Sequence, residues 1–151
     1  NSIKFKRATK SYIDSKFKNI QTNIYEWNKV NLNEIAVKCD IAIIPSSKRH
    51  SDMFLNKSPN KLHLMWKLGL PTLTSFSHSY KEAMDSAQLN MICYKKQDWT
   101  DKIIYYYDND KERAVVSKKS YEYVTKHHSD ITQIQKWDKA FETLNFDFKK
   151  N

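Results

Sequence analysis

The segment KSPNKLHLMWKLGLPTLTS, residues 57–75, decides the fold of this chain. Ser58 is a favourable helix N-cap, and Pro59 suits the first helical position because it lacks the N–H that would have no partner there. The single glycine of the chain, Gly69, stands where the helix must stop, in a left-handed conformation that glycine adopts at low cost. We therefore predict a helix over 59–69 that is buried on most sides.

Strands are predicted on both sides of this helix. Residues 40–44 (DIAII) form an unbroken apolar run, which is typical of a strand buried on both faces of a parallel sheet. Pro71 prevents the helix from continuing, and residues 72–75 (TLTS) form the next strand. Strand, loop, helix and strand together predict a β-α-β crossover, and a further strand over 91–94 (MICY) extends the sheet.

The regions before and after the crossover are predicted to differ. Two strands, over 2–8 and 20–27, are separated by a loop over 11–18, and a short helix capped by Asn31 follows. After the crossover the pattern is mainly helical, with a helix expected over 79–87 and three more over 99–107, 111–127 and 131–145 that are capped by Asp98, Asp110 and Asp130. The apolar side chains of the last three helices that we expect to face inward are Trp99, Ile103, Ile104, Tyr107, Val115, Tyr121, Val124, Ile131, Ile134, Trp137, Ala140, Phe141 and Leu144.

The fold class that follows is α/β. We predict a Rossmann-like three-layer domain with a small, mainly parallel sheet and a helical C-terminal third, and a single domain over 1–151. The two cysteines, Cys39 and Cys93, adjoin predicted strands and are interpreted as reduced, buried thiols of a cytoplasmic protein. No spacing of Cys and His is typical of zinc, so we expect no metal.

The charge of the chain is strongly lopsided. The net charge is +9, and residues 1–75 carry 13 basic and five acidic side chains, which accounts for +8 of it. Such a field favours an anionic partner: a phosphorylated small molecule, a nucleic acid or an anionic membrane surface.

The start of helix 59–69 is a candidate phosphate site. Ligands of open parallel sheets bind beyond the carboxyl ends of the strands, and helix N-termini attract anions. The polar and basic residues expected around this crevice are Ser46, Arg49, Lys57, Ser58, Asn60, Lys61 and Ser75. The alternative is structural, because Ser-Pro is also ordinary capping chemistry and a basic loop is often merely solvated.

The order of these motifs resembles a known family. CDIAIIP, then KSPNKLHLMWKLGLPTLTS, SYKEAM, DW, DKER and KWDKAFETL are similar to the C-terminal, nucleotide-sugar-binding half of GT-B glycosyltransferases in the family 4 and family 1 grouping, of the bacterial surface-polysaccharide type. The resemblance covers about residues 20–145. It implies transfer of a hexose-type sugar from a nucleoside-diphosphate sugar to a hydroxyl acceptor in polysaccharide or glycolipid synthesis, without a cofactor or a tightly bound metal.

The resemblance also implies roles for particular residues. Ser58, Asn60 and Lys61 would hold the donor phosphates, and Lys57 or Arg49 would neutralise the leaving diphosphate. A second set would hold the nucleobase or ribose or form the rim of the crevice, and it consists of Trp27, Asn28, Ser46 and Ser75. Trp27 could equally be a core residue.

This sequence departs from the family pattern in several places. Asn56 and Leu64 stand where many members carry a pair of glutamates, and the glycine-rich loop of many members is not visible. The resemblance further implies that the acceptor-binding N-terminal domain and the first β-α unit lie outside this chain. No catalytic residue is assigned, since His50 and His78 fall in predicted loops and His63 is expected to face solvent or pack near the helix start.

Two other function classes remain open. A nucleic-acid-binding module would suit the basic first half, but no helix-turn-helix, aromatic RNA-binding motif or arginine cluster is visible, so no nucleic-acid partner is expected. A non-catalytic basic α/β interaction domain would bind no small ligand. Docking on an anionic membrane surface is compatible with the glycosyltransferase reading, in which the protein is cytoplasmic and membrane-peripheral.

Overall fold

The computed structural model describes residues 11–15, 18–25, 28–46 and 55–144. The chain divides into two compact units, residues 1–37 and 38–151. The predicted strand over 2–8 lies outside the described residues. The expectation of a single domain over 1–151 stays a prediction.

The described residues of the first unit contain two helical segments, 11–15 and 29–36, and residues 18–25 are irregular or in turns. Residues 11–15 are helical rather than part of a loop, and residues 20–25 form no strand, so the second predicted strand is wrong over its described part. The predicted short helix is confirmed as α2, Lys29–Ala36, but its N-cap is Asn28. The Asn28 side chain accepts a hydrogen bond from the Asn31 backbone N–H at 2.7 Å, a bond that satisfies one N–H of the first turn.

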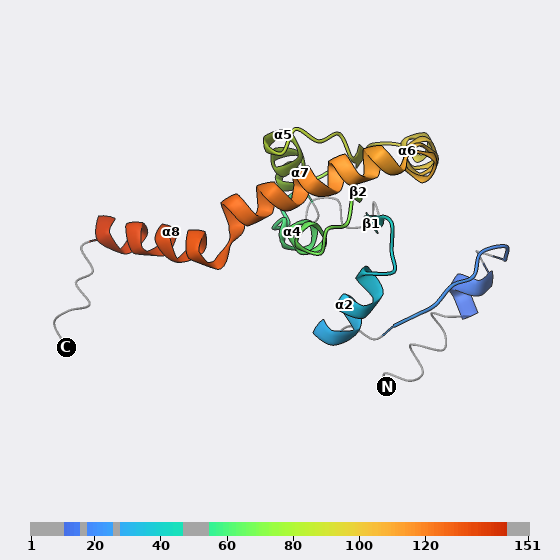
Figure 1. Cartoon of the computed structure of the whole chain (residues 1–151), viewed down its shortest axis with the longest axis horizontal. Coiled ribbons are helices and arrows are strands. Elements are labelled where there is room, and N and C mark those ends of the chain that lie inside the picture. Colours follow the sequence, from blue (N-terminus) through green and yellow to red (C-terminus); the bar gives the residue numbers. More distant parts are fainter. Residues whose placement is uncertain (1–10, 16–17, 26–27, 47–54, 145–151) are drawn as a thin grey trace. The chain divides into compact units, whose positions relative to one another are not determined.

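The second unit contains a parallel three-stranded sheet in the order β1-β2-β3, of which Figure 1 labels β1 and β2. The strands are β1 (Ala42–Ile44), β2 (Thr72–Ser75) and β3 (Ile92–Cys93). The register pairs Ala42 with Thr72 and Thr74 with Ile92. The α/β class with a small parallel sheet is therefore confirmed.

Burial differs from strand to strand. Thr72, Leu73 and Thr74 of the central strand β2 are fully buried. Ile43 of β1 is 55% exposed, so the expectation that the strand over 40–44 is buried on both faces is wrong. The other edge strand, β3, is buried because α5 and α6 pack on it, and an apolar run in the sequence does not reveal what covers each edge of a sheet.

The first crossover runs through α4, Asn60–Lys67. The helix begins one residue later than predicted, because the carbonyl of Pro59 accepts the first helical bond, from the His63 N–H at 3.0 Å. Pro59 is thus the N-cap and Ser58 precedes it, which corrects both assignments. Leu62 and Trp66 are completely buried, as the apolar pattern indicates.

Gly69 ends α4 as predicted. Its φ is +74°, its N–H bonds the Trp66 carbonyl at 3.0 Å, and the Leu70 N–H bonds the Met65 carbonyl at 3.0 Å. This pair of bonds is the Schellman pattern, whose left-handed residue is usually glycine. The Gly69 carbonyl also accepts a hydrogen bond from Ser117 Oγ at 2.6 Å, which joins the turn to α7.

The second crossover runs through α5, His78–Ser86, capped by Ser77, whose Oγ accepts from the Tyr80 N–H at 3.2 Å. α5 also ends in a Schellman pattern, but its left-handed residue is a glutamine instead of a glycine. Gln88 has φ +53°, and the Leu89 N–H bonds the Met84 carbonyl at 2.8 Å.

Two further helices cover this unit. They are α6 (Lys96–Asp108) and α7 (Asp110–His128), and α7 packs along α4. Asp98 was expected to be the cap of α6 but is its third residue, where it accepts from the Tyr94 and Lys95 N–H groups at 2.8 and 3.2 Å. The inward faces are confirmed at Val124, which is fully buried, and at Trp99, which packs partly buried on the core, but the other buried residues are Tyr106 of α6 and Val116 and Ser120 of α7. The exposed ones are Ile103, Ile104, Tyr107, Val115 and Tyr121.

The last described helix is α8, Asp130–Thr143, with Ser129 as its N-cap instead of Asp130. Its apolar stripe was expected to face inward, yet no residue of this helix is buried, and Ile131, Ile134 and Trp137 are 70%, 59% and 63% exposed. Cys93 is buried as predicted and Cys39 is exposed, and both are free thiols. No helix in the described ranges has the length and apolar character needed to cross a membrane.

Candidate functional site

The carboxyl ends of β1 and β2 meet at one edge of the sheet. Ser46 and Ser75, which were predicted to share a crevice there, lie in contact: the Ser46 backbone N–H donates to Ser75 Oγ at 2.9 Å. This follows from the register, which pairs Ile44 with Thr74 and so aligns the residues just beyond them. Parallel sheets place their ligands at such an edge.

The chain segment before α4 is attached to the start of α5. Ser79 Oγ donates to the Lys57 carbonyl at 2.5 Å and lies 3.3 Å from the Oγ of Ser77, the α5 cap. Ser77 follows β2 by two residues, so this contact brings the approach to α4 near the carboxyl end of β2. The starts of α4 and α5 therefore lie close together.

The first turn of α4 differs from that of α5 in how it is capped. The N-cap of α4, Pro59, makes no side-chain hydrogen bond to the helix, whereas Ser77 caps α5 with its hydroxyl. Uncapped N–H groups at a helix start, together with the dipole, attract an anion. Asn60 and Lys61 are exposed in this turn, so an amide and an ammonium group are available beside those N–H groups.

The other predicted site residues are distributed as follows. Lys57 and Ser58 are exposed just before α4. Asn28 lies in the first unit, where its carboxamide oxygen caps α2. Trp27 and Arg49, as well as His50, lie outside the described residues.

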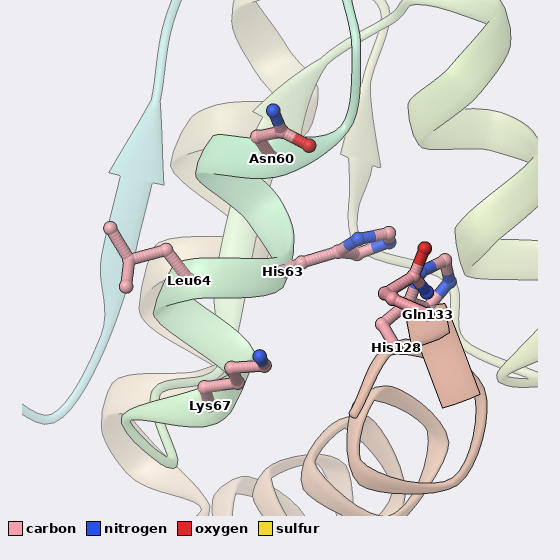
Figure 2. A pocket seen from close by; sticks show the side chains of 6 residues that line it. All are labelled: Asn60, His63, Leu64, Lys67, His128 and Gln133. Carbon is pink, nitrogen blue, oxygen red and sulfur yellow. The ribbon is translucent and has the colours of Figure 1, made fainter. Parts of the chain in front are cut away.

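A pocket of about 410 Å³ lies on the side of α4 that faces α7 and α8 (Figure 2). Figure 2 shows the ring of His63 directed from α4 toward His128 and Gln133. The residues that line the pocket are Asn60, His63, Leu64, Lys67, His128 and Gln133. The four from α4 are spaced i, i+3, i+4 and i+7, which is one face of a helix.

His63 is the most unusual group of this pocket. It is the fourth residue of α4 and 8% exposed, so of the two expected alternatives it packs near the helix start and does not face solvent. Its Nε2 has no hydrogen-bond partner among the described residues. Its ring centroid lies 3.9 Å from that of His128, and it also contacts the rings of Trp66 and Tyr123. Sequence reasoning missed the pocket, although the helical spacing of its α4 residues was visible.

Both imidazoles are neutral near pH 7, because their surroundings lower the pKa of each ring. Burial is the main reason that the pKa of His63 falls from 6.5 to about 4. The pKa of His128 is also lowered, again chiefly by burial. Smaller contributions come from the ammonium groups of Lys67 and Lys136 and, for the protonated form of each imidazole, from a neighbouring histidine. Two positive charges therefore lie near the two neutral imidazoles.

Among the residues that the structure describes, no cluster of three or more His, Cys, Asp or Glu side chains could hold a metal ion. Comparison of the chain with protein-family models, with curated proteins and with solved structures gave no match.

Proposed function

We propose that this chain is the nucleotide-sugar-binding domain of a GT-B glycosyltransferase, with a Rossmann-like fold. The observation that carries the proposal is the contact of Ser46 with Ser75 at the carboxyl edge of a parallel sheet, together with the hydrogen bond from Ser79 that brings the approach to α4 near the same edge. The motif order of the sequence, from CDIAIIP to KWDKAFETL, supports the same family.

In this proposal the donor diphosphate lies at the first turn of α4. The backbone N–H groups and the Asn60 amide donate hydrogen bonds to its oxygens, and Lys61 supplies a full charge. Lys57, which the contact with Ser79 attaches to the start of α5, neutralises the charge that develops on the leaving nucleoside diphosphate. Ser46 and Ser75 form the opposite rim.

Transfer itself would require an acceptor hydroxyl and a base, and the second domain of a GT-B enzyme would supply the acceptor site. We therefore expect this chain to bind the donor nucleotide while transferring little sugar by itself. The net charge of +9 would also favour approach to an anionic membrane surface.

The test is titration calorimetry of the chain with UDP, GDP, CDP and ADP at low and moderate salt. We expect one nucleotide to bind preferentially and Lys61→Ala to weaken that binding at least about tenfold, as loss of a charge-assisted phosphate contact would. Lys118→Ala, on the exposed surface of α7, is the control and should bind like the unaltered chain.

A nucleotide complex equally tight in Lys61→Ala and in the control would contradict the site assignment. Binding of oligonucleotides with a steep salt dependence, and of no nucleotide, would instead favour the nucleic-acid alternative.

A further inference from the structure

We propose that the pocket beside α4 is a second anion site, separate from the sheet edge, that takes the phosphate group of a small molecule between His63, Lys67 and His128. It shares α4 and Asn60 with the diphosphate site but differs from it in its other elements, since it lies between α4, the end of α7 and the start of α8.

The first argument is the buried imidazole of His63. Its Nε2 is enclosed, without a hydrogen-bond partner in the described part of the chain, and the ring lines the pocket. Buried polar atoms of folded proteins nearly always have a partner, from the protein, from water or from a ligand. A group that fills the pocket would provide one.

The second argument is the sign of the surrounding charge. The six lining residues include one ammonium group and two imidazoles but no carboxylate. The ammonium of Lys136 also lies near, where it donates to the His127 carbonyl at 3.2 Å. Gln133 donates to the same carbonyl at 3.4 Å with one N–H of its amide and retains a second. These donors suit the oxygens of a phosphate group.

A metal ion fits the same residues less well. Two histidines are the only strong metal ligands that line the pocket, and protein zinc sites use at least three protein ligands. The ammonium groups of Lys67 and Lys136 would repel a cation. An anion is attracted by the same charges, and it would reduce their mutual repulsion.

The size of the pocket indicates more than inorganic phosphate. About 410 Å³ falls in the range of sites for small organic ligands. Leu64 supplies an apolar part of the lining, so a phosphate monoester with a compact organic group is the class that fits.

Binding should be linked to protonation. The groups around the two imidazoles are Lys67 from α4, Tyr123 and His127 from α7, and Lys136 from α8. A bound dianion offsets the repulsion by the cationic groups among them, so it raises the pKa of His63 and His128 and favours uptake of a proton. The affinity for an anion of constant charge therefore rises as the pH falls.

The experiment follows the histidine ring signals of the whole chain by NMR during titration with sulfate, a tetrahedral dianion whose charge does not change between pH 8 and pH 6. Chloride keeps the ionic strength constant. We expect saturable shifts of the His63 and His128 signals. The dissociation constant for sulfate should be at least threefold lower at pH 6 than at pH 8. Phenyl phosphate at pH 8 should bind more tightly than sulfate.

Matched variants separate this site from general charge attraction and from the nucleotide site. Lys67→Gln should weaken sulfate binding at least fivefold, whereas Lys111→Gln, at the opposite end of α7, and Lys61→Ala should leave it within twofold. His128→Gln, at a partly exposed position, should abolish most of the pH dependence. Shifts that do not saturate, equal binding by Lys67→Gln and Lys111→Gln, or an affinity that is the same at pH 6 and pH 8 would each overturn the proposal.

Discussion

The two crossovers of the sheet share a pattern of hydrogen bonds but differ in what covers them. Both α4 and α5 end in a Schellman turn. α7 packs along α4, and Trp66 of α4 lies edge-on to Tyr123 of α7 at 5.7 Å between ring centroids. α5 packs mainly on β3 and carries an exposed ion pair between Lys81 and Asp85.

The two crossovers of the sheet are therefore stabilised by different contacts. The helices of both crossovers bury an aromatic side chain, Trp66 in α4 and Tyr80 in α5, but the first crossover also has a covering helix and a buried imidazole, while the second has a side-chain cap. Substitutions and pH should therefore act more strongly on the first crossover than on the second.

The largest expected effect is that of Trp66→Ala. Trp66 is completely buried, so the free energy of unfolding should fall by about 3–5 kcal/mol, the loss typical of a large aromatic removed from a core. Urea denaturation measures it. Trp137→Ala on α8, where the side chain is 63% exposed, should change the same quantity by less than about 0.5 kcal/mol. Similar losses in the two variants would show that α4 is not the covered helix.

The second largest effect should be that of pH on the free energy of unfolding, and it should act through His63. Its folded pKa of about 4 lies below the ordinary 6.5, so the unfolded chain binds the proton more readily. The stabilisation that follows is complete above pH 6.5 and is lost as the pH falls toward 4, by an amount on the order of 2 kcal/mol.

Urea denaturation between pH 7.5 and pH 4 tests this coupling in the unaltered chain, in His63→Gln and in His78→Gln. His78 opens α5 and is exposed, so its variant should keep the full pH dependence, whereas His63→Gln should lose most of it. Parallel curves for all three proteins would rule out His63 as the source.

The sequence was sufficient for the parts of this fold that depend on local signals. The strand over 72–75 matches β2 residue for residue, and the end of α4 at Gly69 is confirmed because a left-handed turn has a direct signature in sequence. Helix caps were shifted by one to three residues, since Asn28 competes with Asn31, and Ser129 with Asp130, and tertiary context chooses between such neighbours.

The parts that depend on long-range packing could not be predicted in the same way. The stripe of α8 has the period of a buried helix, but no described element covers it, and periodicity alone does not state what lies opposite. At the candidate site, Ser46 and Ser75 were correctly expected at one edge of the sheet. His128 and Gln133 were missed because they reach His63 only through the packing of α7 and α8.

The smallest expected effects come from substituting Gly69 and Gln88, the left-handed residues at the ends of α4 and α5. Gly69→Ala should lower the free energy of unfolding by about 1 kcal/mol, because φ is +74° and an alanine is strained there. Space is not the reason, since an added Cβ would lie 3.7 Å from Ser117 Oγ. Gln88→Gly should instead stabilise the protein, because it removes the same strain at φ +53°.

The gain from Gln88→Gly should be smaller than the loss from Gly69→Ala, at about 0.5 kcal/mol, because a new glycine also increases the entropy of the unfolded chain. Thermal unfolding of both single variants and of the double variant measures the two terms. The turns lie in separate crossovers, so their effects should add. Destabilisation by Gln88→Gly would mean that the glutamine side chain contributes more at the end of α5 than its backbone strain costs, and the two turns would then be alike in hydrogen bonding but not in energy.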